Sequence, residues 1–122
     1  MTAKNNQSEA LLECIVRAGD DRLASDIVAL NVQELSALAD YFVIMTAQNE
    51  RQLQAVADAI TEAVEKAGFA LKNEEGKGEG HWVLLDCYDV IVHLFLAKER
   101  ETYQLEKLWH EAPLVNVNPW LS

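Results

Sequence analysis

The sequence predicts one α/β domain, in which helices are layered on a single mixed sheet. With 122 residues, half of them apolar, the chain is long enough for one domain with one core. Segments with helical spacing and short apolar runs follow one another in the order α-β-β-α-β-β-β-α. This alternation is typical of helices packed on a sheet. The unbroken apolar run 41–45 indicates a central strand that is covered on both faces.

The first helix is expected from residue 8. Ser8 is a favoured N-cap residue, and Gly19 is a natural residue to follow the C-terminus of a helix. Two strands are expected next, at 26–32 and 40–46, because both segments are rich in apolar residues. The apolar positions of the helix recur at helical spacing: Leu11, Leu12, Ile15 and Val16.

The longest helix is expected to begin after Asn49, with Gln52 completing a pattern similar to a capping box. Gly68 marks its end. A third strand is expected at 69–71, so that strand, helix and strand form a right-handed crossover. The buried face of the helix is predicted from apolar residues at helical spacing: Leu53, Val56, Ala57, Ile60 and Val64.

The second half of the chain predicts a β-hairpin and a last helix. The glycine-rich polar stretch 76–80 is expected to be a mobile connection. Strands are predicted over 82–86 and 90–96, joined by a short turn through Cys87 and Tyr88. A short helix is predicted over 99–109, and the proline at 113 forbids its continuation.

Charge and composition exclude several classes of protein. The net charge is −10, with no basic cluster, so the chain is a poor candidate for binding nucleic acid and a plausible partner for a basic molecule. The apolar runs are far shorter than the ~20 residues that cross a bilayer. Residues 1–20 contain no apolar h-region, so we expect no signal sequence, and two cysteines are too few for a disulfide framework. We therefore expect a cytoplasmic protein.

One pair of carboxylates suggests an enzyme. Asp86 and Asp89 could hold magnesium for nucleotidyl transfer. Their spacing spans a turn, whereas two acids on one strand face alternate, and the chain has no Gly-Ser dipeptide to cradle a phosphate. Aspartate in a turn is also ordinary backbone chemistry. We predict no catalytic residues.

The histidines and the second cysteine predict no metal site. They lack paired ligand spacing such as C-x-x-C or H-x-x-x-H, so separate structural roles in the core or at the surface are favoured. No cofactor is expected. The residues considered as ligands are His81, Cys87, His93 and His110.

Trp82 is the most informative side chain. Alternation along its strand puts Trp82 and Leu84 on one face, and Val83 and Leu85 on the other. If the second pair lies in the core, the first pair forms an apolar patch of the kind that binds proteins. The alternative is that helices cover both faces and Trp82 is simply buried.

Ordered motifs along the chain resemble the ribosomal silencing factor family, also called Iojap. The resemblance covers residues 8–112, which we expect to form one domain with terminal extensions at 1–7 and 113–122. The motifs are D-Y-F-V-I at 40–44, R-Q at 51–52, W-V-L-L-D at 82–86, D-V-I-V-H-L-F at 89–95 and Y-x-L-E-K-L-W at 103–109.

This resemblance implies a fold similar to nucleotidyltransferases but without their catalytic residues. It implies a protein that is not an enzyme and that binds the fourteenth large-subunit ribosomal protein. Binding there blocks joining with the small subunit and represses translation when nutrients are scarce. The resemblance also implies a homodimer when the protein is free. An enzyme that uses Asp86 and Asp89 remains the alternative.

The resemblance also implies the residues of the partner-binding site. Trp82 matches the family tryptophan associated with the interface, and its neighbours are carried over with it. Many members have glycine where this chain has Tyr88. Because tyrosine suits a two-residue turn with positive φ poorly, we expect a wider turn here. The expected site residues are Trp82, Leu84, Tyr88, Asp89 and His93.

Overall fold

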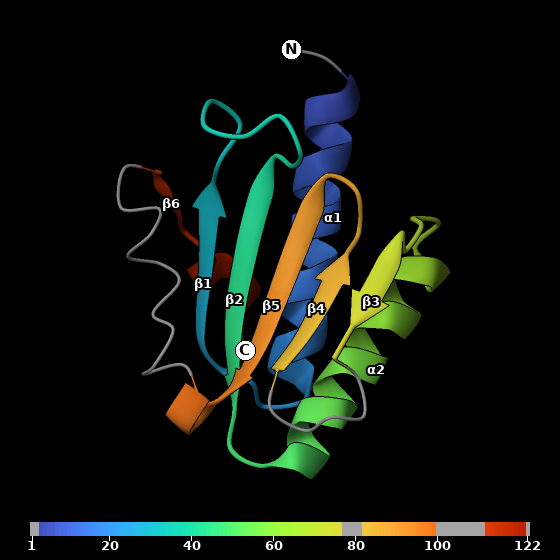
Figure 1. The fold of residues 1–122 in the computed structure, drawn as a ribbon. Helices are drawn as coiled ribbons and strands as arrows, with labels where there is room; N and C mark the ends of the chain where they lie inside the picture. The colour runs from blue at the N-terminus through green and yellow to red at the C-terminus, as the bar shows by residue number, and fades with distance from the viewer. Residues whose placement is uncertain (1–2, 77–81, 100–111, 122) are drawn as a thin grey trace.

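Among the residues that the structure describes, a six-stranded mixed sheet packs against two α-helices (Figure 1). The computed structural model describes residues 3–76, 82–99 and 112–121. The strand order is β3-β4-β5-β2-β1-β6. Within the described residues, the elements are α1 (Ala3–Asp21), β1 (Ser25–Asn31), β2 (Tyr41–Ala47), α2 (Glu50–Lys66), β3 (Asn73–Glu75), β4 (Trp82–Asp86), β5 (Val90–Leu96), β6 (Leu114–Val115) and the 3₁₀ helix η1 (Asn118–Trp120).

The predicted mixed α/β sheet is confirmed. β2 and β5 pair in parallel at its centre, and the other neighbouring strands pair antiparallel. β2 is almost wholly buried, as its apolar run predicted. The predicted helix over 99–109 lies, from residue 100 on, outside the residues that the structure describes.

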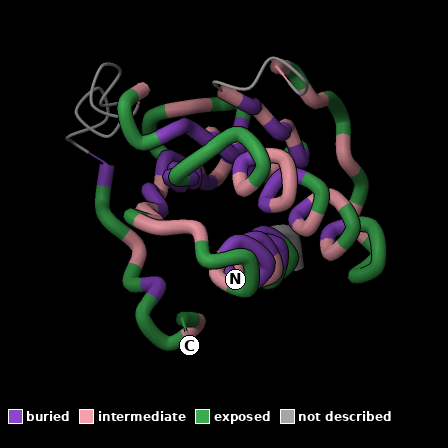
Figure 2. Tube along the Cα trace, turned by 90° about the horizontal axis from the view of Figure 1, so that it is seen from below, coloured by how far each residue is buried: buried purple, intermediate pink, exposed green. Residues whose placement is uncertain are grey.

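The two faces of the sheet differ. α1 and α2 both lie behind the sheet in the view of Figure 1, and the main core is buried between them and that face (Figures 1 and 2). We call the opposite side the open face. It carries a smaller buried cluster, with partly buried side chains packed against it: Leu30, Val32, Ile44, Phe95 and Ala112, then Val28, Phe42 and Trp82.

The expected start of the first helix is wrong. α1 begins at Ala3, so Ser8 lies inside the helix and is fully buried. Its hydroxyl donates to Asp40 Oδ2 at 2.6 Å. This tertiary hydrogen bond, and not a cap, is the role of the serine, because a buried hydroxyl must find a partner.

The expected end of the first helix is also wrong. Gly19 is buried inside α1, which continues to Asp21. A Cβ at Gly19 would overlap the side chain of Met45, so glycine lets α1 approach β2 closely. With 19 residues against 17, α1 and not α2 is the longer of the two helices.

Replacing Ser8 by alanine is expected to lower the free energy of unfolding by about 1–2 kcal/mol, because the Asp40 carboxylate loses a hydrogen bond in a partly buried place. Urea unfolding measures the change. Ser36→Ala is the control: its hydroxyl accepts an exposed bond from the Leu38 amide, and we expect a loss of less than about 0.5 kcal/mol. Equal stability of Ser8→Ala and wild type would contradict this role.

Local signals define α2 as predicted. The Asn49 side chain accepts from the Gln52 amide at 2.8 Å, and the Gln52 side chain accepts from the Gln48 amide at 2.7 Å. Gly68 ends the helix in a Schellman motif, with the Phe69 amide donating to the Val64 carbonyl.

The third strand is displaced from its expected position. It spans Asn73–Glu75, whereas 69–71 was expected. Phe69 and Leu71 instead pack against the main core as partly buried side chains. Their apolar character thus reflects packing against the core and not a strand. The strand itself forms farther along the chain, where the backbone pairs with β4.

The tail beyond residue 113 contributes to the sheet. β6 pairs with β1, with Leu114 opposite Leu30, and the Asn31 amide donates to the Pro113 carbonyl. Val117 is buried in the main core. A two-residue strand carries no periodicity of its own, so the sequence pattern could not reveal it.

Candidate functional site

The open face presents a strip of partly exposed apolar and aromatic side chains. The strand register sets them side by side: Leu84 lies opposite His93 and Phe42 opposite Ile91, while Trp82 lies opposite Phe95. We call this strip the apolar strip. Its partly exposed members are Phe42, Trp82, Leu84, Ile91 and His93.

Among the described residues, four rings in this region form an aromatic cluster: Phe42, Trp82, His93 and Phe95. The indole of Trp82 stacks near His93 at 6.5 Å and near Phe95 at 6.4 Å between ring centroids. His93 also stacks with Phe95 at 6.3 Å and meets Phe42 at 5.6 Å with tilted planes. These separations lie in the range of favourable aromatic pairs, so the cluster holds Trp82 in one orientation.

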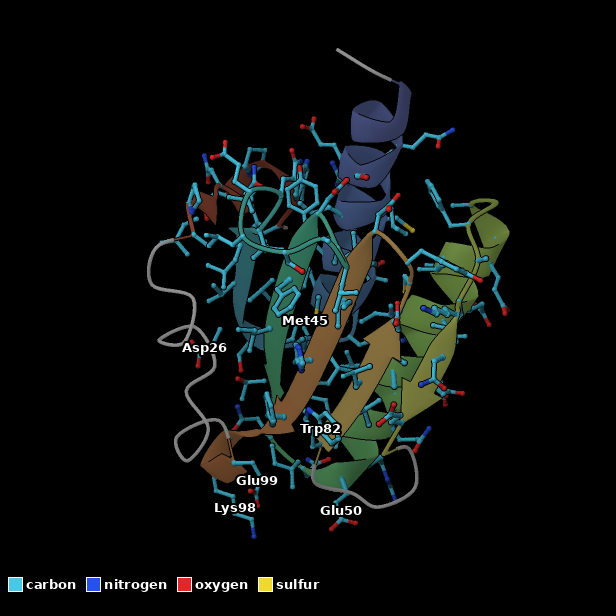
Figure 3. The ribbon with its side chains drawn as sticks, turned by 45° about the horizontal axis from the view of Figure 1, so that its top comes forward. Asp26, Met45, Glu50, Trp82, Lys98 and Glu99 are labelled. Atoms are coloured by element: carbon cyan, nitrogen blue, oxygen red, sulfur yellow. The ribbon has the colours of Figure 1, made fainter. Side chains whose placement is uncertain are left out.

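The geometry decides between the two interpretations of Trp82. Val83 and Leu85 are buried in the main core, whereas Trp82 is partly exposed on the open face. Trp82 lies at the end of β4 farther from the β4–β5 turn, near Lys98 and Glu99 (Figure 3). Trp82 is thus available to a partner. Gly76 packs closely against the backbone at this end of β4, because a Cβ at position 76 would overlap the Trp82 carbonyl.

His93 is an uncharged polar group at the centre of the aromatic cluster. Its Nδ1 is buried and has no hydrogen-bond partner among the described residues. Burial lowers the pKa of the imidazole from 6.5 to about 4. The ring is therefore neutral at pH 7, and the middle of the apolar strip carries no charge.

Tyr88 and Asp89 lie apart from the other three expected site residues, in the β4–β5 turn. The Cys87 amide donates to the Val90 carbonyl at 2.9 Å, so the loop has two residues. The expected wider turn is wrong: Tyr88 adopts a φ of 69° and is exposed.

Hydrogen bonds hold this turn in its unusual conformation. The Asp86 carboxylate accepts from the Tyr88 amide at 2.9 Å. The Asp89 carbonyl accepts from the amides of Asp40, at 2.7 Å, and Tyr41. These bonds offset the strain of a tyrosine at positive φ. One carboxylate of the suggested catalytic pair therefore shapes the turn.

A hollow lies at the opposite end of the sheet from this turn. It has a volume of about 820 Å³ and is lined by the start of α2 and the residues that follow β5. β5 runs from the turn to this hollow over seven residues. Asp86 and Asp89 do not line the hollow. The acidic pair is thus separate from this hollow.

No metal site is found among the described residues, in which no three His, Cys, Asp or Glu side chains gather. His81 and His110 lie outside these residues. Burial raises the pKa of the Cys87 thiol to about 12, so it does not form a thiolate at neutral pH. Within the described ranges, no helix has the length and apolar character to cross a membrane.

Comparison with known proteins identifies the family. The model of the family described as "Ribosomal silencing factor during starvation" matches residues 5–121. The chain belongs to this family. The resemblance found in the sequence motifs is thereby confirmed, and the match of the silencing factor family includes β6 and η1.

Two relatives named ribosomal silencing factor RsfS support this membership. The protein of Halalkalibacterium halodurans is 40% identical over 115 residues, which cover 94% of this chain and 98% of the relative. The protein of Bacillus subtilis is 41% identical over 110 residues, covering 90% and 93%. A crystal structure of a Chromobacterium violaceum protein matches with a TM-score of 0.83 at 30% identity, covering 84% of this chain and 86% of that one.

Sequence reasoning missed part of the apolar strip. Phe42 and Ile91 lie on the open face beside Leu84 and His93, but they fall within nearly continuous apolar strands. In such strands, alternation does not tell one face from the other. No signal in the sequence separates the two faces here, and only the observed pairing of β2 with β5 places Phe42 opposite Ile91.

Proposed function

We propose that this protein is a ribosomal silencing factor that binds the large ribosomal subunit through its fourteenth protein. Bound there, it blocks joining with the small subunit and so represses translation when nutrients are limiting. Family membership and the names of the relatives support a regulatory factor that acts on the ribosome and is not an enzyme. The observation that carries the proposal is the apolar strip around Trp82, on the face opposite α1 and α2.

The chemistry of the strip suits a protein partner. Trp82 is a large aromatic side chain that is partly exposed and held by stacking, as interface anchors are. The proposed contact residues are Trp82, Leu84 and His93 on the open face, with Tyr88 and Asp89 in the turn. A protein that binds ribosomal RNA needs Lys and Arg to neutralise phosphates. The net charge of −10 therefore favours encounter with such a protein and disfavours direct binding to RNA.

Three further properties belong to the proposal. The protein works in the cytoplasm, where ribosomal subunits join. It needs no cofactor, because a block of subunit joining is steric. It forms a homodimer when free, and sedimentation equilibrium of the purified protein tests this association.

Co-sedimentation with purified large subunits tests the function. We expect the protein to pellet with large subunits and to remain in solution with small subunits. At moderate salt, filter binding to protein-free ribosomal RNA should detect no specific complex. Failure to pellet with large subunits, or tight binding to the RNA alone, would refute the proposal.

A further inference from the structure

Large exposed apolar side chains gather at one end of the sheet. Leu38 is 82% exposed and Leu35 46% exposed on the connection between β1 and β2, and Tyr88 is 53% exposed in the β4–β5 turn. Both segments lie at the same end of the sheet (Figure 1). The Asp40 amide donates to the Asp89 carbonyl at 2.7 Å, which ties the two segments together. We call Leu35, Leu38 and Tyr88 the end patch.

The β1–β2 connection holds its leucines in place. The amides of Leu35 and Ser36 both donate to the Val32 carbonyl, and the Val32 amide donates to the Asp40 carbonyl. The Leu38 amide donates to the Ser36 hydroxyl. Because its backbone is bonded internally, the segment presents Leu35 and Leu38 at a low entropic cost of binding.

The end patch continues the apolar strip. Leu38 precedes Phe42 by four residues and Tyr88 precedes Ile91 by three, which is at most roughly 14 Å of chain. Phe42 and Ile91 are direct partners in the register of β2 and β5. A partner seated on the strip at this end therefore reaches the end patch.

The exposed area of the apolar strip alone is too small for a stable protein–protein interface. Its five members are each only partly exposed. The summed accessible area of five side chains of this size is then about 450 Å² or less. A stable interface covers about 800 Å² on each partner. The partner must also cover neighbouring surface, and the end patch adds three strongly exposed apolar side chains there.

We propose that the end patch is part of the same interface, so that Leu35, Leu38 and Tyr88 contact the large-subunit protein together with the apolar strip. This inference rests on the proposed function. Glu34 and Asp89 adjoin patch residues along the chain, and their carboxylates complement the basic surface expected of a ribosomal protein, while Lys72 Nζ lies 5.9 Å from the centroid of the Tyr88 ring. Carboxylates of two copies would face each other across this patch, which disfavours a second copy of this chain as its occupant and leaves other surfaces for the homodimer.

Affinity for purified large subunits tests the inference. The double variant Leu35→Ser/Leu38→Ser should bind about tenfold more weakly or worse, because exposed anchors are lost from the interface. Its melting temperature should match that of wild type. Leu23→Ser is the matched control: Leu23 is 79% exposed in the turn before β1, at the other end of the sheet. Its affinity should not change.

A second measurement does not depend on the double variant folding. A photo-crosslinking amino acid at position 38 should link the chain to a large-subunit protein, and the same group at position 23 should not. Unchanged affinity of the folded double variant, or equal crosslinking from both positions, would overturn the inference while wild-type binding leaves the proposed function intact. If wild type itself does not bind large subunits, both the inference and the proposed function are refuted.

Discussion

Replacing Trp82 by glutamate is expected to abolish inhibition of subunit joining while the protein stays folded. Truncation of such an anchor commonly costs about 2 kcal/mol or more of binding free energy, roughly a thirtyfold loss of affinity. Glutamate should do worse, because it also places an unpaired charge against the partner. Trp82 is partly exposed and lies outside the main core, so the fold should tolerate the charge.

The melting curve and the inhibition of subunit joining should be measured on the same preparation. Ala70→Glu is the charge control, since Ala70 is exposed on the connection between α2 and β3 and should keep full inhibition. Trp82→Phe keeps a ring in the aromatic cluster and should lose less affinity than the glutamate variant. A folded Trp82→Glu protein that inhibits like wild type would remove this residue from the site.

His93 is expected to make the fold sensitive to acid. Its pKa is about 4 in the folded protein, because burial disfavours the charged ring, against about 6.5 in the unfolded chain. Below pH 6.5 the unfolded chain therefore binds a proton that the folded protein does not. The stability is complete above this pH and is lost progressively as the pH falls toward 4. The loss should reach roughly 3 kcal/mol.

Urea unfolding at pH 7, 5 and 4 measures this loss. Many carboxylates titrate in the same range, so the informative quantity is the difference between wild type and His93→Phe. Phenylalanine fills the place among Phe42, Trp82 and Phe95 without a titrating group. The variant should lose roughly 3 kcal/mol less than wild type between pH 7 and 4. Parallel pH profiles of the two proteins would show that the buried imidazole is not the cause.

The candidate site could be predicted only in part from the sequence. Alternation along one strand placed Trp82 on the side opposite Val83, and the structure confirms this placement. The neighbourhood of Trp82 was not available from that strand. Phe42, His93 and Phe95 come from β2 and β5, and only the pairing of strands sets their rings beside the indole. The end patch likewise needs two loops distant in sequence to meet through Asp40 and Asp89.

Features that depend on neighbours along the chain could be predicted from the sequence alone. Asn49, Gln52 and Gly68 define the ends of α2 through bonds that span three to five residues. The alternating mixed α/β order and the family motifs could also be recognised, because both are patterns of residues close together along the chain. Other features depend on contacts between distant parts of the chain. The local preferences of Ser8 and Gly19 predict helix ends, but both residues lie inside α1, where they contact Asp40 and Met45.

Strand positions at the edges of the sheet also depend on tertiary structure. β3 and β6 have three and two residues, too few to show a period, and they exist because β4 and β1 offer unpaired backbone groups beside them. Tyr88 takes a conformation that its residue type disfavours because Asp86 and Asp89 hold the turn around it. A buried or paired group gains free energy only from what surrounds it in space, and a single sequence does not state those neighbours.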